Sequence, residues 1–332
     1  MENARKILDH RLGFAVKAMG AEIPSHDTRK YQNSPHLRVS LEFFDRILDY
    51  LAANRIALYR LSSEFAPFLT HPDRPQFHRQ IEESRAEIEK IAQKVVDLGV
   101  RLSFHPSQYI LLNSPDEDLT ARSVADLDWQ ARLLDMFGQG REGALVLHLG
   151  GVYDDRETAI DRYCQRYERL PRHIRNHLVL ENDDIRFSVA DVLKAHSRTG
   201  VPVVFDFQHH HCNNPEGMSL REAMERAAAT WPRSVTPKVH FSSPRTELRT
   251  VERKVNGKKT ATLQPPLTTQ HADYVNPFEF AYFLRETEPI AFDVMLEAKA
   301  KDLAVIRLCD EFEKRPWLLT ADRRADVLTA QV

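Results

Sequence analysis

Residues 201–209 read VPVVFDFQH, an apolar run that ends in a carboxylate and is followed within three residues by an imidazole. A short run rich in β-branched residues is typical of a parallel strand that is buried on both faces. Amphipathic stretches at 188–199 and 219–230 flank the run and predict helices, the first with Ser188 as its N-cap. The segment is therefore one strand within an alternating arrangement of strands and helices.

The same alternation extends in both directions along the chain. Eight units in one chain favour a closed (α/β)8 barrel, the TIM barrel, over an open sheet. We predict one barrel domain over residues 1–315 and a polar C-terminal tail at 316–332. The predicted strands cover 11–16, 55–61, 100–104, 144–149, 177–181, 201–206, 237–241 and 292–297, and the predicted helices cover 40–54, 76–98, 118–137, 156–168, 188–199, 219–230, 277–285 and 299–311.

A basic insertion at 245–266 interrupts the alternation after the seventh predicted strand. Asn256-Gly257 predicts a turn within it, so we expect an exposed excursion of the chain. Two interpretations stay open, namely that its basic side chains grip phosphates or that they form a solvated charged loop. Those side chains belong to Arg249, Arg253, Lys254, Lys258 and Lys259.

Composition is that of a globular protein. The chain has 332 residues, of which 42% are hydrophobic and 28% charged, which argues against disorder. No run approaches the roughly 20 apolar residues of a membrane helix, and the start MENARKILDH lacks the apolar core of a secretion signal. Three scattered cysteines imply no disulfide framework. We expect a cytoplasmic monomer, and a net charge of −2 counts mildly against a nucleic-acid partner.

Ligand-type side chains stand at the carboxyl ends of the predicted strands or on the loops that follow them. In a barrel these ends converge on one face, where catalytic residues of the fold lie. Nine imidazoles and carboxylates crowded together require cations between them. The nine residues are His71, His105, His148, Glu181, Asp206, His209, His240, His271 and Glu297.

This donor set predicts a metal centre. Mixed imidazole and carboxylate ligands suit zinc, manganese or iron better than magnesium or calcium. Nine ligands exceed the needs of one ion, so we predict two or three ions with Glu181 and Glu297 as bridges. Clustered metals recur in phosphodiester hydrolysis, which indicates metal-assisted transfer of a phosphoryl group to water.

Any single histidine at a strand end is more often a packing residue than a ligand, and only the joint pattern outweighs that interpretation. Histidines on predicted helices, loops or strand starts are assigned to the surface. They are His10, His26, His36, His78, His173, His177 and His196. In the HHHC run, His210, His211 and Cys212 are assigned supporting roles beside His209.

At these motifs the sequence resembles the ultraviolet damage endonuclease family, barrels related in architecture to endonuclease IV and to xylose-isomerase-like enzymes. The resemblance covers nearly the whole chain. It implies that the nine residues hold manganese-type divalent ions, with zinc as the alternative. The motifs are RLSSEFAPFLTHP around His71, LSFHPSQYILLNSP around His105, VLHLGGVYDD around His148, VLENDD at Glu181, VVFDFQHH at Asp206 and His209, PKVHFSSPR at His240, HADYV at His271 and DVMLEAKAKD at Glu297.

The resemblance also implies an activity on damaged double-stranded DNA. Family members nick immediately 5′ of pyrimidine dimers, photoproducts and often abasic sites, and leave a 3′-hydroxyl. Gln108 and Tyr109 match the pair that probes the weakened duplex. Lys238 matches a family lysine, so it either stabilises the phosphate's developing charge or has an amine pKa low enough for modification. We therefore assign catalytic roles to Lys238 and to the bridging carboxylates Glu181 and Glu297.

Phe14 and Ala18 stand where the family often has a tyrosine and an asparagine near the lesion, which makes lesion preference an open question.

Three rival functions also remain open on the residues alone. They are an apurinic endonuclease of the endonuclease IV type, a metal-dependent sugar isomerase, and a non-catalytic protein that binds metal or DNA.

Overall fold

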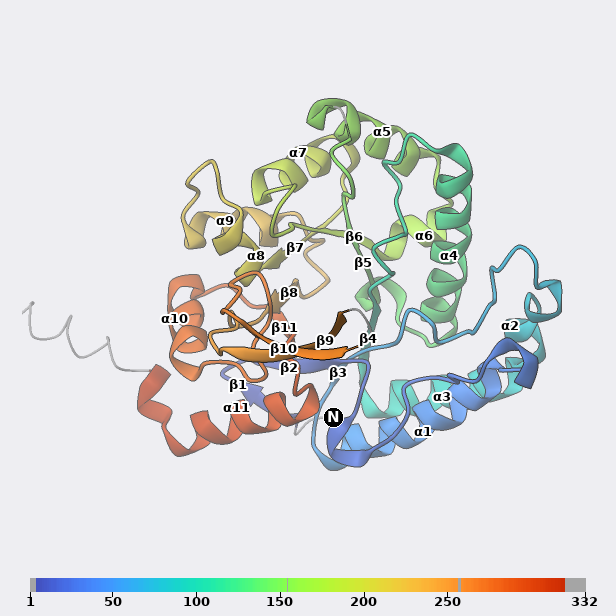
Figure 1. Ribbon diagram of the computed structural model, residues 1–332, viewed down its shortest axis with the longest axis horizontal. Coiled ribbons are helices and arrows are strands. Elements are labelled where there is room, and N and C mark those ends of the chain that lie inside the picture. The colour runs from blue at the N-terminus through green and yellow to red at the C-terminus, as the bar shows by residue number, and fades with distance from the viewer. Residues whose placement is uncertain (1–3, 154, 256–257, 320–332) are drawn as a thin grey trace, which may run out of the picture.

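In the computed structural model, which describes residues 4–153, 155–255 and 258–319, eight parallel strands form a closed ring (Figure 1). Pairing of β2 with both β3 and β11 closes the ring, so the predicted TIM barrel is confirmed. A two-residue strand, β1 (Lys6–Ile7), adds antiparallel to β2. In order around the ring the strands are β2 (His10–Ala15), β3 (Leu58–Arg60), β4 (Arg101–Phe104), β5 (Ala144–His148), β6 (Leu178–Glu181), β7 (Val203–Asp206), β8 (Lys238–Phe241) and β11 (Asp293–Leu296).

Helices surround the ring and cover its outer face (Figure 1). The larger ones are α1 (Leu37–Ala53), α3 (Arg85–Leu98), α4 (Glu117–Met136), α5 (Arg156–Arg169), α7 (Val189–Thr199), α9 (Leu220–Ala229), α10 (Pro277–Thr287) and α11 (Asp302–Lys314). Short helices are α2 (Gln80–Glu83), α6 (Arg172–His177) and α8 (Phe207–Cys212), with single 3-10 turns η1 (Met19–Ala21), η2 (Tyr31–Asn33), η3 (Pro75–Phe77), η4 (Gly140–Glu142) and η5 (Pro316–Leu319). Among the described residues, no helix is both long and apolar enough to span a membrane.

Three predicted helices differ from the observed ones by three residues or more at their start or within their length. The first begins at Leu37 rather than at residue 40, with His36 as its N-cap. The helix expected at 76–98 is interrupted, because Ser84 leaves the helical conformation with ψ 17° and ends α2 before α3 begins. The last helix was expected at 299–311 but begins at Asp302, since Lys301 adopts a left-handed φ of 54°.

Alternation along each strand separates two packing environments. Outward residues such as Phe104 and Phe205 join the main hydrophobic core beneath the helices. Inward residues form smaller apolar clusters within the barrel, one of them around Val146, Val179 and Val204. Each strand therefore has a second side that faces the barrel axis and ends at the mouth of the barrel.

The inward positions also carry charge at the N-terminal end of the barrel. Arg101 Nη1 lies 2.7 Å from Asp293 Oδ2, and both side chains are 2% exposed. Arg11 donates to the same carboxylate through Nε and Nη2. This network occupies the end of the barrel opposite the predicted site, because Arg101 and Asp293 are the first residues of β4 and β11.

The predicted insertion forms a hairpin of two antiparallel strands, β9 (Arg249–Val255) and β10 (Lys258–Gln264). The predicted turn at Asn256-Gly257 lies outside the described residues. The expectation of exposure is wrong for Arg245, whose buried guanidinium donates to Gln270 Oε1 and to two backbone carbonyls. Arg245 therefore fixes the base of the hairpin to the barrel.

Two histidines assigned to the surface are buried, so that assignment is wrong for them. His10 stacks on Phe292 and contacts its carbonyl through Nδ1. His177 is 1% exposed, with its ring between the Gly143 carbonyl and the Asp135 carboxylate. Both positions follow from packing between segments that are distant in the sequence.

Candidate metal centre

Six of the nine ligand-type side chains come from the carboxyl ends of six neighbouring or facing strands. His148, Glu181 and Asp206 are the last residues of β5, β6 and β7, and His240 lies in β8. The remaining two follow their strands directly, His105 after β4 and Glu297 after β11. Because alternate residues of a strand share a side, these positions face the barrel axis together with the inward residues below them.

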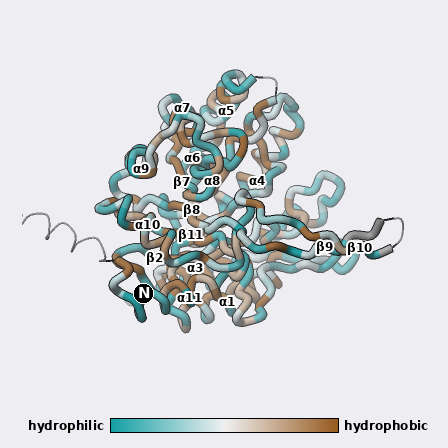
Figure 2. Tube along the Cα trace, turned by 60° about the vertical axis from the view of Figure 1, so that its left-hand side comes forward, coloured by the Kyte–Doolittle hydropathy of each residue, from teal (hydrophilic) through white to brown (hydrophobic). Residues whose placement is uncertain are grey.

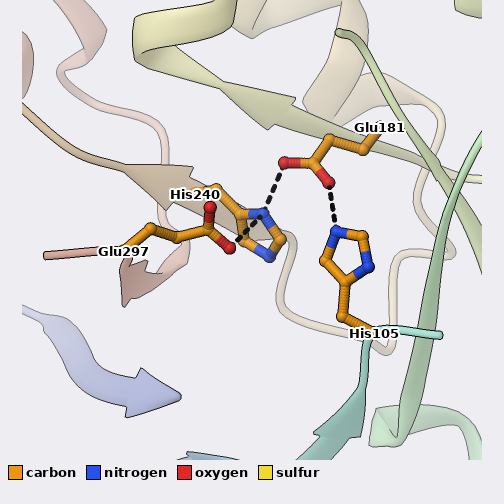
Figure 3. Close-up of side chains that lie close together, drawn as sticks. All are labelled: His105, Glu181, His240 and Glu297. Atoms are coloured by element: carbon orange, nitrogen blue, oxygen red, sulfur yellow. Dashed lines mark hydrogen bonds and ion pairs between the residues drawn. The ribbon is translucent and has the colours of Figure 1, made fainter. Parts of the chain in front are cut away.

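Glu181 lies at the centre of the group and faces four imidazoles. Its Oε2 lies 3.0 Å from His105 Nε2 and 3.4 Å from His148 Nε2. Its Oε1 lies 2.6 Å from His240 Nδ1 and 3.8 Å from His209 Nδ1. Figure 3 shows the carboxylate between His105 and His240, with Glu297 on the far side of His240. One fully buried carboxylate therefore links ligands from five different segments.

Glu297 and Asp206 extend the group in two directions. Glu297 Oε1 lies 3.4 Å from His240 Nδ1, and its Oε2 lies 3.5 Å from His271 Nε2. Asp206 caps α8 by accepting from the backbone N–H of His209 at 2.7 Å, and its Oδ1 lies 3.7 Å from His209 Nδ1. The short helix α8 thus begins at the site and holds His209 beside the carboxylate that precedes it.

The donor atoms form two groups that could each hold an ion. One contains His105, Glu181, His240 and Glu297, and the other contains Glu181, Asp206 and His209; within each group the donor atoms lie within 4.8 Å of one another. Glu181 is common to both. The sequence-based expectation of a bridging carboxylate therefore has a direct geometric counterpart at Glu181.

His148 and His271 border these groups, whereas His71 lies apart from them. His71 Nδ1 accepts from the backbone N–H of Asp73 at 3.2 Å. With Tyr109 it lines a neighbouring cavity of about 530 Å³, which none of the other eight predicted ligands lines. The structure thus brings eight of the nine residues together and places His71 beside the loop that follows β4.

The pKa values of the three buried carboxyl groups in the site are shifted from their usual range. Burial opposes the charged forms of Glu181 and Glu297, but His240 beside Glu181 and Arg60 beside Glu297 outweigh it, so both pKa values lie well below the usual range. Burial raises the pKa of Asp206, with the Glu181 and Glu297 charges adding to the shift. Three carboxyl groups so close together repel one another when charged, so nearby cations favour their ionised forms.

The two best-defined imidazoles shift in opposite directions. Burial lowers the pKa of His105 to about 4, although the Glu181 carboxylate opposes the shift. Burial also opposes charge on His209, but Asp206, Glu181 and Glu297 outweigh it and raise its pKa to about 9. Metals bind the neutral form of imidazole. Near neutral pH a cation would therefore displace a proton from His209, whereas His105 is already neutral.

A metal fits this donor set. Asp206 Oδ2 is buried and has no hydrogen-bond partner among the described residues. Unpaired buried carboxylate oxygens are costly, and a cation is the usual partner for one. Mixed nitrogen and oxygen donors suit divalent transition-metal ions.

Two cationic side chains accompany the carboxylates. Lys238 is fully buried and donates to Ser103 Oγ at 2.7 Å, and burial, with Arg60 and Arg101 nearby, lowers its pKa well below the usual range. Arg60 Nη1 lies 2.5 Å from Glu297 Oε1. Arg60 was not among the predicted site residues, although its place as the last residue of β3 is the same signal that identified the ligands.

The predicted probing pair lies on the loop that follows β4 and His105. Gln108 and Tyr109 are both exposed, the tyrosine by 70%. Phe14 and Ala18, in contrast, are buried, and Phe14 packs edge to face against Tyr59. The two departures from the family pattern therefore lie within the core rather than on the surface.

Comparisons with known proteins agree with this architecture. The family model described as UV-endonuclease UvdE matches residues 32–317. A UV DNA damage endonuclease from Bacillus cereus (strain G9842) is 34% identical over 278 residues, which cover 83% of this chain and 81% of the relative. A crystal structure of SacUVDE has a TM-score of 0.77 at 27% identity and covers 92% of this chain and 98% of its own. An L-ribulose 3-epimerase, with a TM-score of 0.55 at 16% identity over 97% of this chain and 99% of its own, shares the fold alone.

The resemblance inferred from the strand-end motifs is thus confirmed. A match over most of the length, an identity above 30% and a similar solved structure all indicate the same group of proteins. The chain belongs to the UV-endonuclease UvdE family.

Proposed function

We propose that this protein hydrolyses the DNA backbone immediately 5′ of ultraviolet photoproducts and abasic sites and leaves a 3′-hydroxyl. Its family supports a UV-damage repair endonuclease. The observation that carries the proposal is the Glu181 carboxylate shared by two groups of ligand-type side chains at the mouth of the barrel. A shared carboxylate suits two ions held close together, and two-metal sites recur in phosphodiester hydrolysis.

The ions would be held by His105, Glu181, His240 and Glu297 on one side and by Asp206 and His209 on the other. His148 and His271 stand close enough to complete these sets, and we keep His71 as a ligand that approaches from the neighbouring loop. Manganese is the proposed metal and zinc the alternative. Bound divalent ions supply activated water and steady the leaving oxygen.

The chain's own cations have separate roles in the proposal. The Arg60 guanidinium lies at the mouth against Glu297, where it can bind a phosphate oxygen of the strand to be cut. Lys238 lies one inward position below His240 and places an amine beneath the carboxylates. We propose that it stabilises the charge that develops on the phosphate, either directly or after modification of its low-pKa amine.

Damage selection is assigned to the loop after β4. Tyr109 presents a ring that can replace a lost base stack, and the Gln108 amide can pair with an orphaned base. A lesion that has weakened stacking lowers the cost of inserting these side chains. Because the loop continues directly from His105, insertion would bring the neighbouring phosphate to the metal centre.

Nicking of three end-labelled duplexes tests the proposal: one with a single pyrimidine dimer, one with an abasic analogue and one undamaged. With manganese present we expect cuts 5′ of both lesions, ends that a DNA polymerase extends, and no cut after chelation. His105→Ala should abolish cutting, whereas His196→Ala, a matched histidine outside the site, should cut as the wild type does. Cutting that persists in the chelated wild type, or in His105→Ala, would overturn the metal-centre assignment.

A further inference from the structure

The hairpin of β9 and β10, which we call the arm, is not used by the chemistry described so far. It projects from the body of the molecule (Figure 2). The arm leaves from the carboxyl end of β8, and therefore from the face of the barrel that carries the metal centre. At about 3.4 Å per residue, its seven-residue strands reach roughly 20 Å from their base.

The base of the arm is fixed to the site. Arg245 donates its backbone N–H to the Gln270 carbonyl at 2.7 Å, and Pro244 forms a bridge with His271. Arg249, the first residue of β9, pairs with Asp273 at 2.8 Å. The chain that enters the arm follows His240 and the chain that leaves it returns to His271, so both ends adjoin predicted ligands.

The arm and the probing loop leave from opposite sides of the barrel mouth. In the ring of eight strands, β4 and β8 are separated by three strands in either direction. The probing loop follows β4, and the arm follows β8. A duplex probed by Tyr109 and cut at the metal centre would therefore extend toward the arm.

Charge distinguishes the arm from the rest of the chain. Residues 249–264 contain five basic residues and one acidic residue, a net charge of +4, whereas the whole chain carries −2. The remaining residues therefore sum to −6. The rest of the protein is negatively charged and would repel a DNA backbone. Positive charge concentrated on the arm would offset that repulsion where the arm meets the duplex.

The described side chains of the arm are available to a partner. Lys259 is 75% exposed and its pairing with Glu252 at 3.3 Å lies on the surface, where an ion pair holds a side chain weakly. Thr260, Ala261 and Thr262 beside it are exposed as well. Apart from Leu263, which is 67% exposed, the exposed side chains of the arm that the structure describes are polar or small.

We propose that the arm is a second DNA-contacting element, which binds backbone phosphates of the duplex independently of damage. This inference rests on the proposed function, because it takes the duplex to cross the mouth of the barrel. Contacts to phosphates carry no sequence information, so the arm contributes affinity and placement while the probing loop contributes selection. Its partner is double-stranded DNA rather than a protein.

The test measures binding of the manganese-loaded protein to an undamaged fluorescent duplex by anisotropy over a series of potassium chloride concentrations. One variant replaces residues 249–264 with a short Gly-Ser linker. A second variant is Lys259→Glu. Its matched control is Lys90→Glu, because Lys90 on the outer helix α3 is exposed to a similar degree and also pairs with an acidic residue, Asp45 of α1. Thermal unfolding confirms that each variant remains folded.

We expect the arm deletion to weaken binding about tenfold or more at low salt. Each phosphate contact contributes about −0.9 to the slope of log affinity against log salt concentration, so losing contacts makes the slope shallower. We expect it to become shallower by about two or more in the deletion variant and by about one in Lys259→Glu. Lys90→Glu should match the wild type. Wild-type affinity and slope in the folded deletion variant would overturn the proposal. A wild type that binds through the arm but leaves photoproduct duplexes uncut would refute the proposed function instead.

Discussion

Asp206→Asn should change the stability of the protein in opposite directions with and without metal. The aspartate is fully buried, and its Oδ1 accepts from the His209 backbone N–H. An asparagine keeps this cap, since the two residues are equivalent N-caps. The substitution therefore changes little besides the charge and the unpaired Oδ2.

The expected gain without metal follows from that oxygen. A buried acceptor without a partner costs about 1–3 kcal/mol. Burial, with Glu181 and Glu297 nearby, raises the pKa of Asp206, so the folded protein disfavours its charge. The amide that replaces Oδ2 can donate toward those carboxylates. We expect the metal-free variant to be more stable by about 1–3 kcal/mol, a rise in Tm of about 1–4 °C.

With metal the sign reverses. Manganese at a hundredfold excess over its dissociation constant stabilises a site by about 2.7 kcal/mol. Asp206→Asn removes a ligand from the group that contains His209, so the variant loses much of that gain together with nicking activity. Thermal unfolding in chelator and in manganese, followed by a nicking assay, measures all three effects on the same samples.

Asp302→Asn is the matched control. This buried aspartate uses both oxygens, because Oδ1 accepts from Met19 N–H while Oδ2 accepts from Gly20 N–H and the Tyr50 hydroxyl. Its amide should destabilise the protein in chelator and in manganese alike. A lower Tm for Asp206→Asn in chelator would refute the reasoning, because it would mean that Asp206 stabilises the fold rather than a bound ion.

Glu181→Gln should reduce nicking by about a thousandfold or more, since it removes the carboxylate common to both ligand groups; a rate within tenfold of wild type would contradict the bridging role. The double substitution Gln108→Ala, Tyr109→Ala should leave metal content unchanged and reduce the preference for dimer-containing over intact duplex in competition assays. The metal-free protein should lose stability as the pH falls from 6.5 toward 4, because His105 resists protonation when folded, with a pKa of about 4. It should also lose stability as the pH rises from 6.5 through 9, because protonated His209 is stabilised in the fold, with a pKa of about 9. His209→Gln should remove the alkaline loss alone, as urea unfolding in chelator would measure.

Much of the site was predictable because it depends on two simple regularities. Alternate residues of a strand share a side, and barrel closure gathers the strand ends. His240 and Glu297 are 57 positions apart in the sequence, yet they meet because β8 and β11 pair in parallel with Met295 opposite His240. Once the strands were located, their ends indicated which ligand-type side chains the barrel brings together.

Packing between distant segments decided what the sequence left open. His71 and His105 each follow a strand, but His71 lies with Tyr109 beside a cavity that none of the other predicted ligands lines. Arg245 looked like part of an exposed basic loop, yet its guanidinium meets Gln270 from the returning chain. Such contacts depend on loop conformations, which neither periodicity nor composition specifies.

The same alternation that gathers the ligand-type residues also places polar side chains beneath two of them inside the barrel. On β4 the inward series runs from Arg101 through Ser103 to His105, and on β8 it runs from Lys238 to His240. Lys238 donates to Ser103 across the barrel, directly below the imidazoles. These two strands therefore place a basic or hydroxyl group beneath their ligand-type residues, whereas Val146, Val179 and Val204 lie beneath His148, Glu181 and Asp206. At Glu181 the neighbouring imidazoles of His240, His148 and His105 outweigh burial and hold the pKa of the carboxyl well below its usual range, which keeps it in the form that binds a cation.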